Sequence, residues 1–374
     1  MLSRTLVSIF LATAVCAAEP IASPAAEVDV LISKASNYLL AQTQPNGSFM
    51  PGDQFVLGVT GLVAEALAVE PSATPASDPR LVKALAFVNG FKQPDGGVYD
   101  PTSPLGNYCT SIALLLWTAT KSGDPASVTA AQNYLWGIQN KDIKNPSLGG
   151  IGYGSKGVGF EDLSNTSWAV NALKTSGVPS TDPRMQQALK FLERCQDLSS
   201  VNKLPWAGNS GGAVYSPDES KAAGSWDRTP PKADAPAPKL APYGSMTYAL
   251  ISSYAVLDLK ADDPRVVAAL AWVKANYQFD ANPGMAAGKE QQGLFYYYLL
   301  MSRTYQVTGI KTIDLPNGTK ADWRVDLLKA IQQRVTIDGD KAYWANKADR
   351  WAEGSPILVT AYVLKALKAI KSSL

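Results

Sequence analysis

Two carboxylates near the end of the sequence are the first candidates for chemistry. Asp349 and Glu353 lie on either side of Arg350, just before an apolar segment that begins at residue 356. A pair of carboxyl groups can divide the roles of general acid and general base when their surroundings separate their pKa values. We therefore interpret both as candidate catalytic residues, with Arg350 as a ligand-binding residue. The alternative is a helix cap in which a carboxylate pairs with Arg350.

Comparable polar residues precede other apolar segments. Asp162 opens the sequence Asp-Leu-Ser-Asn-Thr-Ser, and Gln291 and Gln292 stand at the start of the segment near 291–307. We include Asp162 among the candidate catalytic residues and the two glutamines among the candidate binding residues. Capping of the following helix is the alternative role for Asp162, because an Asp side chain can accept hydrogen bonds from free backbone N–H groups.

Aromatic residues early in the apolar segments form a third group of candidates. Trp168, Tyr248 and Tyr296 are the ones we predict to contact a ligand. Tyr296 begins a run of three tyrosines, of which at most one or two can face the same side of a helix. An aromatic wall suits an isoprenoid chain or the flat face of a sugar, whereas core packing is the default role of each residue alone.

Composition narrows the possible chemistry. The 374 residues include no histidine, which excludes Ser-His-Asp and Cys-His catalysis and histidine metal ligands. We predict no metal and no cofactor. The net charge of +2 gives no indication of nucleic-acid binding. Cys109 and Cys195 fall in non-adjacent repeats, so we predict that they form no disulfide.

The N-terminal residues resemble an export signal. Arg4 precedes a short apolar stretch and a small-residue cleavage site, so residues 1–18 are predicted to be removed. A lipid anchor on Cys16 is disfavoured because bulky Val15 precedes it. No segment is long and apolar enough to span a bilayer. We expect a periplasmic or extracellular protein with a small-molecule or glycan ligand and no nucleic-acid partner.

A repeated pattern organises the rest of the chain. Asp-Pro pairs that can start a helix occur at residues 78–79, 124–125, 182–183 and 263–264. Each precedes a helix with one apolar stripe, then a turn rich in Gly, such as 149–150, whose glycines we expect to need positive φ or close backbone approach. Wholly apolar second helices are predicted near 58–69, 107–120, 164–176, 244–258, 291–307 and 356–371. We therefore predict six helical hairpins.

One insertion interrupts the repeats at about 198–242. It lacks periodic apolar residues and is predicted to be an irregular surface loop or lid. A linker between two domains is the alternative. Because the hairpin pattern continues unchanged on both sides, we interpret residues 19–374 as a single domain.

The spacing of aromatic, aliphatic and Gln residues in 134–139 and 191–196, followed by Gly, resembles the Gln-Trp repeats of terpenoid cyclases. The chain thus resembles the α/α-toroid superfamily of squalene–hopene cyclases and protein prenyltransferase β subunits. Residues 243–248, 282–285 and 292–298 resemble an exported bacterial branch. The resemblance implies an all-α, six-hairpin toroid in which six inner helices begin at one mouth of a central cavity.

The resemblance also implies possible activities, from which this sequence departs. Squalene–hopene cyclases protonate their substrate with an Asp of a D-x-D-D-T-A motif, but Ser164 and Asn165 stand where the acidic pair should be. Prenyltransferases bind zinc through Asp, Cys and His, and this chain has no His. Three hypotheses follow: a cavity that binds and rearranges an isoprenoid-like ligand, a polysaccharide lyase or hydrolase, and a non-catalytic binding or scaffold protein. A deep apolar cavity, a cleft with carboxylates, or a filled interior would distinguish them.

Overall fold

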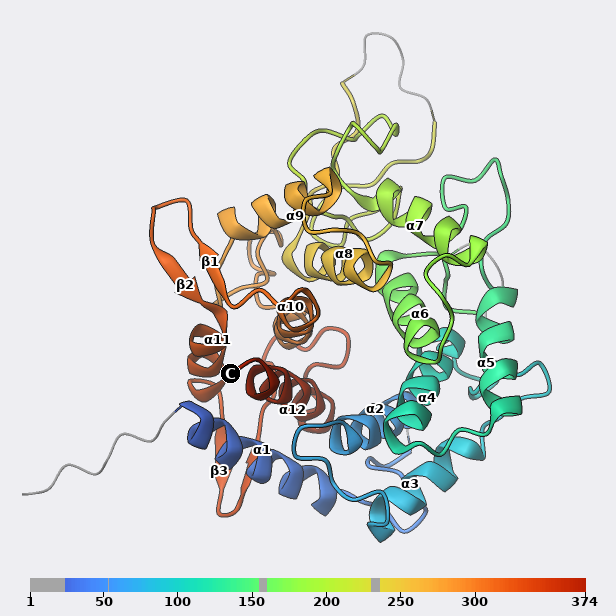
Figure 1. The fold of residues 1–374 in the computed structure, drawn as a ribbon, viewed down its shortest axis with the longest axis vertical. Helices are drawn as coiled ribbons and strands as arrows, with labels where there is room; N and C mark the ends of the chain where they lie inside the picture. Colours follow the sequence, from blue (N-terminus) through green and yellow to red (C-terminus); the bar gives the residue numbers. More distant parts are fainter. Residues whose placement is uncertain (1–23, 53, 155–159, 230–235) are drawn as a thin grey trace, which may run out of the picture.

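A computed structural model describes residues 24–52, 54–154, 160–229 and 236–374. The described residues form two concentric rings of helices (Figure 1). The inner ring consists of α2 (Val56–Ala68), α4 (Gly106–Thr120), α6 (Leu163–Thr175), α8 (Gly244–Val256), α10 (Leu294–Thr308) and α12 (Pro356–Ser373). The outer ring consists of α1 (Pro24–Ala41), α3 (Pro79–Asn89), α5 (Pro125–Gly137), α7 (Pro183–Cys195), α9 (Pro264–Ala275) and α11 (Trp323–Gln332).

The inner ring closes on itself. Each inner helix packs against the next one along the chain, and α12 returns to pack against α2. The inner helices are buried nearly all round, as their apolar sequences predicted. The fold is an α/α toroid, which confirms the predicted class. Outer helices α3, α5, α7 and α9 pack mainly against the inner helix that precedes them, rather than against the one that follows.

The outer helices begin where Asp-Pro pairs predicted. The Asp78 carboxylate accepts a hydrogen bond from the backbone N–H of Arg80 at 2.9 Å, and Asp182 and Asp263 make the same contact with Arg184 and Arg265. These caps satisfy N–H groups that have no partner within the helix. The start of α11 at Asp322 was not predicted. This helix follows the small hairpin of β1 (Thr312–Asp314) and β2 (Lys320–Asp322). A second hairpin pairs β3 (Thr336–Asp338) with β4 (Lys341–Tyr343).

The Gly-rich turns join neighbouring repeats. Gly149 has a φ of +84°, and a Cβ atom there would lie 2.2 Å from the carbonyl oxygen of Gln187 on α7. A Cβ on Gly150 would lie 2.7 Å from the ring of Phe191. The turns are therefore glycine-rich because a neighbouring outer helix passes directly against them, as predicted. Gln196 also joins neighbouring repeats, because its side chain donates hydrogen bonds to the carbonyls of Gly211 and Arg265.

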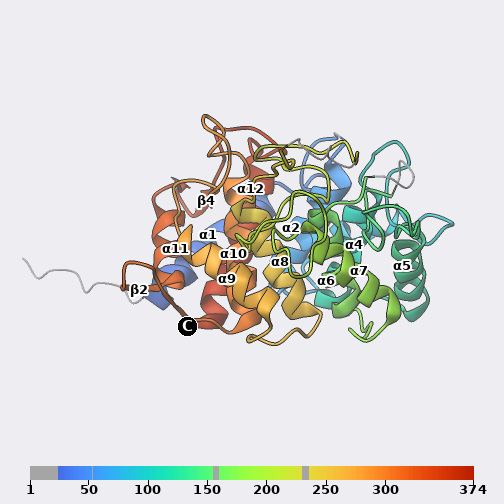
Figure 2. The same ribbon diagram turned by 90° about the horizontal axis from the view of Figure 1, so that it is seen from above.

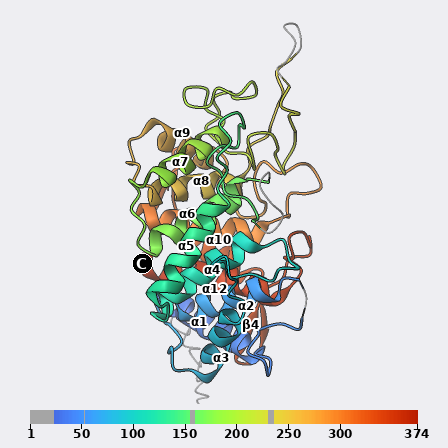
Figure 3. The same ribbon diagram turned by 90° about the vertical axis from the view of Figure 1, so that its right-hand side faces the viewer.

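The long connections gather at one end of the toroid, where the inner helices begin (Figure 2). Within its described residues, the connection between α7 and α8 contains turns and isolated bridges, with a small apolar cluster around Trp206. Figure 3 shows it projecting beside the body of the toroid. The predicted export signal at 1–18, Cys16 included, lies outside the described residues. In the described part of the chain, Cys109 and Cys195 are buried and free, and no helix is apolar over a length that would cross a membrane.

Candidate functional site

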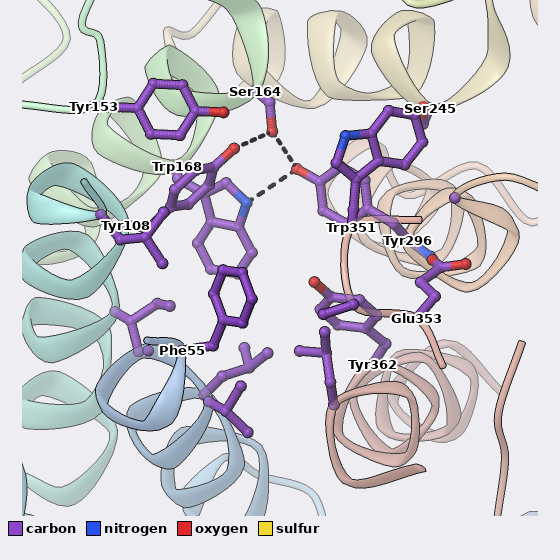
Figure 4. A pocket seen from close by; sticks show the side chains of 18 of the residues that line it. Phe55, Tyr108, Tyr153, Ser164, Trp168, Ser245, Tyr296, Trp351, Glu353 and Tyr362 are labelled. Atoms are coloured by element: carbon purple, nitrogen blue, oxygen red, sulfur yellow. Dashed lines mark hydrogen bonds between the residues drawn. The ribbon is translucent and has the colours of Figure 1, made fainter. Parts of the chain in front are cut away.

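A cavity of about 270 Å³ lies inside the inner ring near the long connections (Figure 4). Every inner helix contributes to its wall from its first two turns: Val59, Tyr108, Ser164, Ser245, Tyr296 and Leu358. Because all six helices start at the same end, their first turns converge there. The volume is slightly below the usual range for small-molecule sites, roughly 300–1,000 Å³.

Aromatic rings dominate the wall of the cavity. They include Trp168 and Tyr362 from the inner helices and Phe55, Tyr215 and Trp351 from the connections. The hydroxyl of Tyr362 points into the cavity in Figure 4. Aliphatic side chains fill much of the remaining wall. The surface offered to a ligand is thus apolar, with a few polar atoms at defined places.

Four side chains form a hydrogen-bonded cluster on one side of the cavity (Figure 4). The Tyr108 hydroxyl donates to Ser164 Oγ at 2.8 Å, and Ser164 Oγ lies 2.8 Å from the Tyr296 hydroxyl. Trp168 Nε1–H also donates to the Tyr296 hydroxyl, at 3.0 Å. Tyr296 therefore joins α6 to α10 across the cavity. Burial raises the pKa of Tyr296 to about 12, so its hydroxyl stays protonated at neutral pH.

Glu353 is the carboxylate that reaches the cavity wall. Its Oε1 accepts a hydrogen bond from the backbone N–H of Tyr296 at 2.7 Å, and its Oε2 accepts from Asn346 Nδ2 at 2.6 Å. The side chain therefore caps α10 from the connection that precedes α12. Burial raises the pKa of Glu353 to about 7, although these hydrogen bonds favour the charged form.

Asp162 lies at the start of α6 and is 1% exposed. Its carboxylate accepts from the backbone N–H of Asn165 at 2.8 Å and from Asn165 Nδ2 at 2.7 Å. Burial raises the pKa of Asp162 to about 6, against the effect of hydrogen bonds from Asn165 and Tyr215. Asp162 is not among the described residues that line the cavity, whereas Ser164, two positions later, is.

The other residues predicted to form a site are placed differently. Tyr248, on α8, is buried against α10, where its hydroxyl lies 2.8 Å from that of Tyr305. Arg350 donates to Gln292 Oε1 at 3.1 Å and stacks on Trp351. Gln291 contacts the carbonyl of Asp280. Exposed Asp349 accepts from the backbone N–H of Gly354 at 2.8 Å.

The structure thus brings together three of the predicted site residues, Trp168, Tyr296 and Glu353, on one cavity wall. Sequence reasoning missed Trp351, which also lines the cavity while remaining 45% exposed. Trp351 and Ala352 both have positive φ, a conformation that is costly for residues other than glycine. The signal that could have identified Trp351 from the sequence is a Trp near a carboxylate within a polar stretch. Among the described residues, no group of His, Cys, Asp and Glu could hold a metal ion.

Comparisons with known proteins find similar structures but no similar sequences. No family model matches the sequence, and no curated protein matches it. The type II terpene cyclase MstE from Scytonema superposes with a TM-score of 0.56 at 16% identity, over 94% of this chain and 99% of that one. The GH76A α-1,6-mannanase from Salegentibacter sp. HEL1_6 superposes with a TM-score of 0.58 at 9% sequence identity, over 94% of this chain and 100% of that one. A D-mannose isomerase superposes with a TM-score of 0.58 at 11% sequence identity, over 93% of this chain and 97% of that one.

These likenesses establish the fold. Terpene cyclase, mannanase and sugar isomerase share the toroid and differ in chemistry, so the fold by itself does not select one activity. The choice among them has to come from the side chains around the cavity of this chain.

Proposed function

We propose that this protein binds a small, largely apolar ligand of the isoprenoid type in the cavity at the mouth of the toroid. One observation carries the proposal: the cavity is walled by aromatic and aliphatic side chains, with polar atoms confined to a few positions. An apolar chain gains free energy when it leaves water for such a surface. A sugar would instead lose hydrogen bonds that this wall could not replace.

The hydroxyl cluster would orient the ligand. Ser164 and Tyr296 present hydroxyl oxygens at one side of the cavity and are already hydrogen-bonded to each other. Hydroxyl groups can both donate and accept, so an alcohol or carbonyl oxygen of the ligand could join this cluster. The rest of the ligand would then lie against Trp168 and Tyr362.

The site favours binding over cyclisation started by a strong acid. Ser164 occupies the place of an acidic residue in the cyclase motif, and a serine hydroxyl is too weak an acid to protonate an alkene. Both oxygens of Glu353 are held by N–H donors of Tyr296 and Asn346. We propose that Glu353 and Asp162 maintain the starts of α10 and α6, and that any rearrangement of the ligand would depend on Glu353.

Two structural neighbours illustrate the alternatives. A variant of MstE is described in complex with geranylgeranyl dihydroxybenzoate, and a variant of the mannanase in complex with α-1,6-mannotriose. The apolar wall supports a ligand that is closer in character to the first.

Export, with residues 1–18 as the signal and 19–374 as one toroid domain, remains part of this proposal. N-terminal sequencing of the secreted chain would test it.

Calorimetric titration with farnesol and with α-1,6-mannotriose tests the proposal. We expect farnesol to bind and mannotriose not to bind. Val59→Trp, which would fill the cavity, should weaken farnesol binding by about tenfold or more, because the added ring occupies the ligand's volume. The matched control Val82→Trp lies on an exposed position of α3 and should bind like the parent. Binding of mannotriose alone, or farnesol binding that Val59→Trp leaves unchanged, would contradict the proposal.

A further inference from the structure

A charged layer lies inside the toroid beneath the aromatic cavity. Arg303 follows Tyr296 by seven residues on α10, which places it on the same helix face about 10 Å farther from the mouth. Glu65 on α2 and Lys365 on α12 follow the cavity residues Leu62 and Tyr362 by three residues each. Three charged residues on three inner helices therefore share the level below the cavity.

Arg303 shares a helix face with Tyr296, which lines the cavity, so it is directed toward the interior of the ring below it. The charge of Glu65 acts to raise the pKa of Arg303, although α10 and α2 are separated in the ring by α12. This influence fits a position of the guanidinium on the inner side of the ring. Lys365 lies 5.6 Å from the centre of the Trp168 ring, so this layer touches the wall of the cavity directly.

The charges in this layer do not balance. Glu65 forms an ion pair with Lys365, which leaves the positive charge of Arg303 without a carboxylate in ion-pair contact within the described residues. Arg303 Nη2 is buried and has no hydrogen-bond partner there. Burial lowers the pKa of Arg303 to about 10, yet the group stays charged at neutral pH. The Arg303 side chain is half-buried as a whole, but a buried guanidinium nitrogen without a partner is costly, and proteins rarely keep one without a use for it.

We infer that Arg303 binds the anionic group of the cavity ligand, which is then an acid with an apolar tail. This inference rests on the proposed function. A carboxylate or phosphate can accept two parallel hydrogen bonds from a guanidinium, which would satisfy the unpaired nitrogen and neutralise the excess charge. The tail would extend from Arg303 past Trp168 into the aromatic cavity, toward the mouth.

Matched probes test this inference. Farnesol and farnesoic acid share one chain and differ in charge, and inorganic phosphate supplies an anion without a tail. At pH 8 we expect the parent protein to bind farnesoic acid at least about tenfold more tightly than farnesol, and inorganic phosphate more weakly than either. Arg303→Met should reduce the preference for the acid to within about twofold and leave farnesol binding unchanged. Arg80→Met, on the outside of α3, should keep the preference.

A second measurement separates a binding role from a structural one. Without ligand, Arg303→Met should melt at the same temperature as the parent protein or higher, because the substitution removes a charged group with an unpartnered buried nitrogen. A lower melting temperature would show that Arg303 stabilises the fold, and would overturn the inference. Equal binding of acid and alcohol by the parent protein would also overturn it while leaving the proposed function intact. Failure of both probes to bind would overturn the two together. Phosphate binding as tight as that of the acid would contradict a ligand with a tail.

Discussion

The backbone N–H of Tyr296 donates a 2.7 Å hydrogen bond to the carboxylate of Glu353, a residue 57 positions later in the chain. Through this contact, the connection that carries Trp351 is attached to α10, the helix that contributes Tyr296 to the hydroxyl cluster. The start of α10 and the rim of the cavity therefore depend on one buried carboxylate. Its environment gives a first prediction about stability.

Stability should fall as the pH rises from about 5 to 8. The pKa of Glu353 is raised from 4.5 to about 7 in the folded protein, so the folded state binds this proton more tightly than the unfolded state. The stabilisation is complete below the unfolded pKa and is lost as the pH passes the folded pKa. Asp162, with its pKa raised to about 6, acts in the same direction. The Glu353 contribution is at most about 3 kcal/mol.

Glu353→Gln should flatten this pH dependence, as measured by urea unfolding at several pH values. Asp349→Asn, on the exposed part of the same connection, should leave the slope unchanged. A slope that is the same in Glu353→Gln and in the parent protein would show that the buried carboxylate is not the group responsible.

Tyr296→Phe should lower the free energy of unfolding by about 1–3 kcal/mol. The substitution removes the acceptor of Trp168 Nε1–H and a hydrogen-bond partner of Ser164, both at a partly buried position. Tyr362→Phe is the control, since this hydroxyl also faces the cavity but makes no hydrogen bond to the other side chains drawn in Figure 4. Chemical denaturation should show little change for Tyr362→Phe. Equal losses in the two variants would mean that the cluster adds nothing to ordinary packing.

Gln196→Leu should cost about 3 kcal/mol or more. The Gln196 side chain donates to the carbonyls of Gly211 and Arg265 and accepts from the hydroxyl of Tyr254, all in a buried place. Gln44→Leu tests the corresponding position of the first repeat, where the side chain bonds locally to the carbonyl of Gln42. Thermal melts should therefore separate the two variants, and comparable shifts would refute a joining role for Gln196.

Gly149→Ala should destabilise the protein by at least about 2 kcal/mol. The added Cβ would meet the carbonyl oxygen of Gln187 at 2.2 Å, and φ is +84°. Gly177→Ala isolates the backbone cost, because φ there is +102° and nothing lies within 4 Å of the added atom. A smaller loss at Gly177, about 1 kcal/mol, is expected. If calorimetry finds the same loss of stability in both variants, the close approach of α7 to Gly149 does not contribute to the cost of the substitution.

The sequence by itself determined the helices, and its resemblance to terpenoid cyclases predicted their arrangement in a toroid. Asp-Pro pairs such as 182–183 mark helix starts because capping and proline geometry act within a few residues. Apolar segments such as 244–258 predicted buried inner helices, and α8 occupies residues Gly244–Val256. The Gly-rich turns were also readable, since Gly149 marks a place where only glycine fits. These signals are local, so a single sequence displays them.

Only the tertiary structure decided which side chains meet in the lumen. Tyr296 faces the cavity, while Tyr297 and Tyr298 turn outward to the carbonyls of Gln278 and Phe279, because the rotation of α10 is set by its neighbours. Closure of the ring likewise brings Ser164 to Tyr296, 132 residues away, and leaves Nη2 of Arg303 without a hydrogen-bond partner in the described part of the chain. Such pairings depend on the relative rotation and height of separate helices, which no short stretch of sequence encodes.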